Sequence, residues 1–152
     1  MAETPTCSCG TNEPKRIIFS CAGVANVGQL TNQASLELAT EGYGVPSCIA
    51  LLASGAEALV TSAKGADEVL ILDGCPMICA KKIADAHQVP VAQHLVVTDL
   101  GIVKGPSKSY TEEDVETVVS AAWRGEGKKK GVSSPTKKNR GSNSGCGCGG
   151  TC

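Results

Sequence analysis

Aromatic side chains are almost missing from this chain. Its 152 residues include one Trp, one Phe and two Tyr. A hydrophobic core must therefore be built from Val, Ile, Leu and Ala, which is typical of a small parallel sheet covered by closely packed helices. No aromatic side chain lies between the lysines near the C-terminus, so the chain lacks the platforms on which nucleic-acid bases stack. The sequence indicates no nucleic-acid partner.

Long apolar runs are missing as well. No run approaches the roughly 20 residues that span a bilayer, and residues 1–14 lack the apolar centre of a signal peptide. We therefore expect a cytoplasmic protein with no membrane partner. Thiols are held reduced in that compartment, so the nine cysteines favour metal binding or thiol chemistry over a disulfide framework.

Composition divides the chain into three parts. Residues 1–14 form a polar tail that contains cysteine, and residues 15–124 carry all the periodic apolar signal of an α/β domain. Residues 125–152 carry a net charge of +5, against −6 for the chain before them, and combine a basic linker with a cysteine-rich end. Both tails are too poor in apolar residues to fold alone, and we expect them to be disordered.

Strand and helix patterns alternate through the central part. The apolar runs predict strands at 16–21, 43–48, 68–72 and 93–98, with residues 49–52 as a possible extension of the second strand. Helical periodicity predicts a helix over 27–38 that stops at Gly42, and others over 56–64, 76–88 and 111–123. Successive β-α units predict a small doubly wound, Rossmann-like parallel sheet of about four strands with flanking helices. The order of the strands is not predicted by these patterns.

Three cysteines are evenly spaced along this pattern. Cys21 and Cys48 are 27 residues apart, and Cys48 and Cys75 are again 27 residues apart. A step of this size is close to one βαβ unit, which places each thiol near the carboxyl end of a strand. Cys79 follows Cys75 by one helical turn. Ligands bind at the carboxyl edge of an open α/β sheet, so four sulfurs are predicted to converge there.

Four thiols at one edge are compatible with three kinds of chemistry. Cys21, Cys48, Cys75 and Cys79 suit a tetrahedral zinc ion, and the main hypothesis is a metal-binding protein that acts in metal handling or delivery. The same ligands also suit an iron–sulfur cluster. Alternatively, Cys75 is the nucleophile of a thiol redox or sulfur-transfer enzyme, with Cys79 or Cys21 resolving the intermediate.

Polar side chains near the thiols have two interpretations each. Asn26, Gln29 and Asn32 form an amide stripe that either faces solvent or donates hydrogen bonds to the sulfurs or to a bound substrate. Asp73 either caps the following helix or stands at the edge of the site as a carboxylate. The glycines after Cys21 lack the Lys-Ser/Thr ending of a phosphate loop. His87 and His94 are expected at the opposite edge.

Five further cysteines lie in the two tails. They are Cys7, Cys9, Cys146, Cys148 and Cys152. Closely spaced cysteines among glycines can wrap a soft metal ion or pass it on by ligand exchange, so they are predicted auxiliary ligands. Such a role implies a metal ion as partner and a protein partner for metal or sulfur exchange. The residues give no indication of the oligomeric state.

Several segments together resemble a known family. They are Ser20-Cys21-Ala22-Gly23, Asn26 to Asn32, Asp73-Gly74-Cys75-Pro76, Cys79-Ala80-Lys81-Lys82, and Val97 to Ile102. In this order, over about residues 16–104, they resemble the DGC-domain family, which is named for an Asp-Gly-Cys triplet. The resemblance implies zinc binding through cysteines, and it implies no particular activity. The two tails are not part of the pattern.

Overall fold

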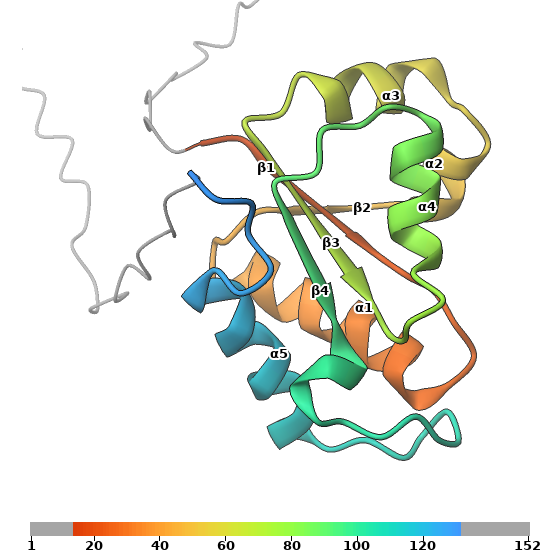
Figure 1. Ribbon diagram of the computed structural model, residues 1–152, viewed down its shortest axis with the longest axis vertical. Helices are drawn as coiled ribbons and strands as arrows, with labels where there is room; N and C mark the ends of the chain where they lie inside the picture. The colour runs from red at the N-terminus through yellow and green to blue at the C-terminus, as the bar shows by residue number, and fades with distance from the viewer. Residues whose placement is uncertain (1–13, 132–152) are drawn as a thin grey trace, which may run out of the picture.

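The protein is a three-layer α/β domain built on one parallel sheet (Figure 1). A computed structural model describes residues 14–131. The strands are β1 (Arg16–Ser20), β2 (Val45–Ser47), β3 (Glu68–Asp73) and β4 (Gln93–Val96), in the order β2-β1-β3-β4. All neighbouring pairs are parallel. The predicted four-strand doubly wound sheet is confirmed.

Helices cover both faces of this sheet. Figure 1 shows α1 (Asn26–Thr40) and α5 (Glu112–Arg124) on one side, and α2 (Ile49–Ala53), α3 (Glu57–Lys64) and α4 (Cys79–Ala86) on the other. Each helix layer has its own buried apolar cluster against the sheet. No helix within residues 14–131 is long and apolar enough to cross a membrane.

The central strand β3 supplies both clusters. Leu70 and Leu72 pack with α1 and α5, while Val69 and Ile71 pack with α2 and α4. Successive side chains of a strand point to opposite faces, so a strand covered on both sides must be apolar at every position. This is why the continuous run of apolar residues correctly predicted a buried strand.

Two helix signals in the sequence act as expected. Gly42 follows α1 with φ of 77°, a conformation that glycine adopts without a steric penalty. Thr111 caps α5, because its hydroxyl accepts a hydrogen bond from the Asp114 N–H and the Asp114 carboxylate accepts one from the Thr111 N–H. The end of α1 and the start of α5 can therefore be predicted from the local sequence alone.

Three segments differ most from the sequence-based expectation, while other boundaries move by one or two residues. Residues Ile49–Ala53 form the short helix α2 and do not extend β2. Helix α4 begins at Cys79, because Pro76 lies in a turn and Ile78 takes a left-handed backbone conformation with φ of 45°. Strand β4 ends at Val96 and is followed by the 3-10 helix η1 (Val97–Leu100). Each difference lies where a loop meets an element, and tertiary contacts decide such positions.

A buried polar network lies at the amino-terminal edge of the sheet, where β4 begins. The hydroxyl of Tyr43 donates to Gln93, whose amide donates to the carbonyls of Ala122 and Glu126. The ring of Tyr43 meets Trp123 edge to face at 4.9 Å. Burial raises the pKa of Tyr43 far above its usual value, which keeps the phenol a neutral donor. The network fastens the end of α5 to β4.

The chain beyond Arg124, where the sequence suggests that the linker begins, continues along the edge of β4. The N–H of His94 donates to the carbonyl of Gly127, and the N–H of Lys129 donates to the carbonyl of Ala92. The Lys128 ammonium lies 3.4 Å from the Glu68 carboxylate. The first residues after α5 therefore cover the exposed edge of the sheet.

Replacing Gly127 with alanine should lower the free energy of unfolding by about 2–3 kcal/mol. Its φ is 68°, and an added Cβ would lie 1.9 Å from the His94 carbonyl oxygen. Urea denaturation of the full chain measures the change. Gly42→Ala is the matched control, because Gly42 has a similar φ of 77° with nothing within 4 Å of an added Cβ. Equal losses in the two variants would contradict the contact with β4.

Candidate functional site

The two central strands end beside each other and then diverge. The chain leaves β1 toward α1 on one face of the sheet, and it leaves β3 toward α4 on the other. Connections that part in this way leave a crevice at the carboxyl edge, where open α/β sheets bind ligands. Cys21 follows β1 directly, and Cys75 stands two residues after β3. The crevice is therefore bordered by two of the predicted thiols.

A cavity of about 550 Å³ occupies this crevice. Cys21, Cys75 and Cys79 line it together with apolar side chains, which are Val24, Val27, Ile49, Met77 and Ile83. We call this cavity the thiol pocket. The structure thus brings three of the four predicted ligands to one pocket, from two segments that are distant in the sequence.

The sulfur of Cys21 is held in a polar setting. The backbone N–H of Gly74 donates a hydrogen bond to it at 3.2 Å. The Thr31 hydroxyl lies 3.8 Å from the sulfur and donates to the Cys21 carbonyl at 2.7 Å. The Gly74 N–H therefore fixes the position of this sulfur beside the loop after β3. Thr31 and Gly74 were not among the predicted site residues.

Cys75 faces a positive charge. The ammonium of Lys104 lies 3.7 Å from its sulfur, and Lys104 itself lines the thiol pocket. An ammonium beside a thiol balances the charge of a thiolate. The sequence carries no signal for this contact, because Lys104 lies in a loop without periodic pattern.

Glycine at position 74 allows the loops to come together. A Cβ on Gly74 would lie 2.8 Å from the backbone of Val27, and a Cβ on Gly28 would lie 2.6 Å from the Gly23 carbonyl oxygen. The first turn of α1 can approach the loop after β3 because Gly74 has no side chain, and it can approach the loop after β1 because Gly28 has none. The central glycine of Asp-Gly-Cys is therefore required by the packing that forms the thiol pocket.

Asp73 caps α4 and is not among the residues that line the thiol pocket. Its carboxylate, 1% exposed, accepts hydrogen bonds from the N–H groups of Ala80 and Lys81 at 2.9 and 3.0 Å. Nε2 of His94 lies 2.9 Å from the same carboxylate. His94 was expected at the opposite edge of the sheet, yet its ring reaches this cap. Of the two roles open for Asp73, the geometry is that of helix capping.

The predicted amide stripe bonds to backbone. Both hydrogens of the Asn26 amide go to carbonyls, of Val103 and Ser109, and its oxygen accepts from Gly105 N–H. Gln29 donates to the Gly23 carbonyl, and Asn32 is exposed. Within residues 14–131, no hydrogen bond joins these amides to sulfur. Asn26 instead holds the loop that carries Lys104 against α1.

The fourth predicted ligand lies apart from the other three. Cys48 is exposed at the end of β2, just before α2, and does not line the thiol pocket. Among the described residues, no three Cys, His, Asp or Glu side chains are grouped closely enough to hold a metal ion. The thiols of the pocket suit a soft metal ion by their chemistry, but they are not gathered around one point. The tail cysteines lie outside the described residues.

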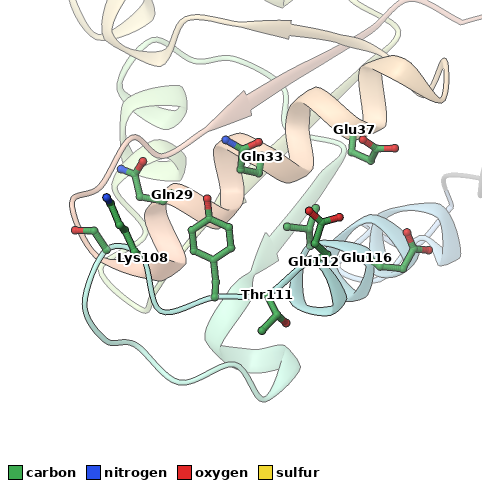
Figure 2. A pocket seen from close by; sticks show the side chains of 10 residues that line it. Gln29, Gln33, Glu37, Lys108, Thr111, Glu112 and Glu116 are labelled. Atoms are coloured by element: carbon green, nitrogen blue, oxygen red, sulfur yellow. The ribbon is translucent and has the colours of Figure 1, made fainter.

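A second hollow of about 1000 Å³ runs between α1 and the segment that leads into α5. Figure 2 shows its polar lining, with Glu37 on α1 and Glu112 and Glu116 on α5. Lys108 and Gln33 also border it. Charged residues on the outer faces of helices are typical of solvated surface. We therefore place the candidate functional site at the thiol pocket.

Two comparisons with known proteins bear on the family of the chain. The model of the DGC domain matches residues 17–122, which include the whole thiol pocket. The chain is 31% identical over 105 residues to the anaerobic and virulence modulator AnvM of Pseudomonas aeruginosa. The aligned segment covers 69% of this chain and 80% of that protein. No solved structure matches the chain. With the family pattern spread over both central strands and their loops, the chain belongs to the DGC-domain family.

Proposed function

We propose that the protein binds a soft metal ion, zinc foremost, through Cys21, Cys75 and Cys79. One observation carries the proposal: three thiols, one after β1 and two after β3, line a single pocket at the carboxyl edge of the sheet. The Gly74 N–H and the Lys104 ammonium face two of these sulfurs. Cysteine ligates zinc through its thiolate sulfur.

Three thiolates leave one of the four positions of zinc free. An open position is typical of zinc that acts on or exchanges a ligand, whereas structural zinc is closed by four protein ligands. Because the three thiols are not grouped around one point, binding requires them to approach each other. A site of this kind suits metal handling or delivery. Tail cysteines and a protein partner for metal exchange remain predicted contributors to the fourth position.

Thiol exchange at Cys75 is the second candidate function, and the Lys104 ammonium 3.7 Å from the sulfur favours it. In this reaction the Cys75 thiolate attacks a sulfur of a substrate disulfide. A mixed disulfide forms between Cys75 and this sulfur, and the other substrate sulfur leaves as a thiolate. Cys79 or Cys21 then attacks the sulfur of Cys75, and the first substrate sulfur also leaves as a thiolate. The substrate disulfide is the oxidant, so the protein ends with a disulfide of its own.

Zinc titration of the reduced full chain tests the main proposal. A variant with all five tail cysteines replaced by serine removes their contribution, and we expect it to retain about one zinc per chain, measured by elemental analysis and competition with a chromogenic chelator. A tail variant that binds no zinc would contradict the proposal. If that variant is instead alkylated much faster at Cys75 than at the exposed Cys48, thiol exchange is the better assignment.

A further inference from the structure

Apolar side chains form most of the walls of the thiol pocket between its three thiols and Lys104. Val27, Ile49 and Ala80 form buried parts of the wall. At the rim, Val24 and Met77 are 81% and 60% exposed. Contact between water and apolar walls is unfavourable, so a ligand whose apolar body covers these walls would be stabilised. The pocket volume, about 550 Å³, lies within the range of small-molecule sites.

Apart from its thiols, the ionisable side chains that line the thiol pocket carry charge of one sign. Lys104 is the charged residue of its lining, and no Asp or Glu of the described part of the chain contributes to it. The ammonium lies 3.7 Å from the sulfur of Cys75, which lines the same pocket. A negative head group on an apolar ligand would meet this ammonium, whereas a cationic head group would be repelled.

We propose that the thiol pocket binds small amphiphilic carboxylates, with the carboxylate at Lys104 and the apolar body against Val24, Ile49 and Met77. This assignment stands on the walls and on the charge, and it does not depend on the metal. The neighbouring groove between α1 and α5 contains three glutamates, which would repel the same ligands. The two hollows are therefore distinguishable by the sign of the ligand.

Octanoate and octanol form a matched pair of probes, because they share an eight-carbon body and differ in the head group. Each is titrated into the reduced, isotopically labelled full chain in the presence of a chelator, and backbone amide shifts are followed by NMR. We expect saturable shifts at Gly23, Ile49 and Gly74. Lys104→Gln should weaken octanoate about three- to fivefold, as expected for an exposed charge pair, and should leave octanol unchanged.

Two further variants complete the test. Lys108→Gln alters a lysine that borders the other groove and should change neither titration. Val24→Asp replaces a highly exposed rim residue, so it should spare the fold while weakening both probes. Shifts away from the thiol pocket, or octanoate binding indifferent to Lys104→Gln, would overturn the proposal. Zinc content is measured separately. A protein that binds no zinc can therefore still bind octanoate, and a protein that binds no octanoate can still bind zinc.

Discussion

Replacing Cys75 with serine should lower zinc in the variant without tail cysteines from about one ion per chain to less than about a tenth of an ion. Serine keeps the size of the side chain but is a poor zinc ligand, and only two thiolates would remain in the thiol pocket. The apparent affinity should fall by about a hundredfold or more, because loss of a ligand in a three-ligand site removes a large part of the binding free energy. Elemental analysis after gel filtration measures the stoichiometry.

The other cysteines supply the comparison that makes this result specific. Cys21→Ser and Cys79→Ser should behave like Cys75→Ser, because both thiols line the same pocket. Cys48→Ser is the matched control, and it should retain zinc because Cys48 is exposed outside the pocket. Loss of zinc in Cys48→Ser would restore the four-cysteine site expected from the spacing. Retention of zinc in Cys75→Ser would refute the site as proposed.

Replacing Asp73 with alanine should lower the free energy of unfolding by about 3 kcal/mol. The substitution removes the acceptor of the Ala80 and Lys81 N–H groups and the partner of His94, in a position where water does not reach the carboxylate. Buried donors left without an acceptor lower the free energy of unfolding, and for a domain of this size that free energy is only about 5–15 kcal/mol. Urea denaturation followed by circular dichroism measures the loss.

Asp99→Ala provides the control for this prediction. Asp99 lies in the 3-10 helix η1 that follows β4, but it is exposed. Its replacement should change the free energy of unfolding by less than about 0.5 kcal/mol. Asp73→Asn should fall between the two, since its amide oxygen can still accept from one N–H of α4. If Asp73→Ala were as mild as Asp99→Ala, capping of α4 by Asp73 would be contradicted.

Local patterns predicted most of the fold because its central strands are buried on both faces. The apolar run of β3, the glycine after α1 and the capping box of α5 each act through neighbours in sequence. Strand order depends on how crossovers return to the sheet, which no local pattern encodes. Equal spacing suggested that Cys21, Cys48 and Cys75 converge, whereas the order β2-β1-β3 places β1 between the strands that precede Cys48 and Cys75.

The residues that the sequence did not reveal act through long-range contacts. Lys104 reaches Cys75 because the Asn26 amide binds the loop between Val103 and Ser109. The sequence left Asn26 either facing solvent or donating to sulfur or to a bound substrate, whereas its amide acts on the thiol pocket through this loop. Polar side chains near a functional site can thus be recognised from sequence, while their partners follow only from the fold.

Anomalous X-ray scattering at the zinc edge, from crystals of the zinc-loaded chain, tests the central claim most directly. The account predicts one strong peak in the thiol pocket, at about 2.3 Å from the sulfurs of Cys21, Cys75 and Cys79. A peak bound by Cys48, or zinc found only away from the carboxyl ends of β1 and β3, would contradict it.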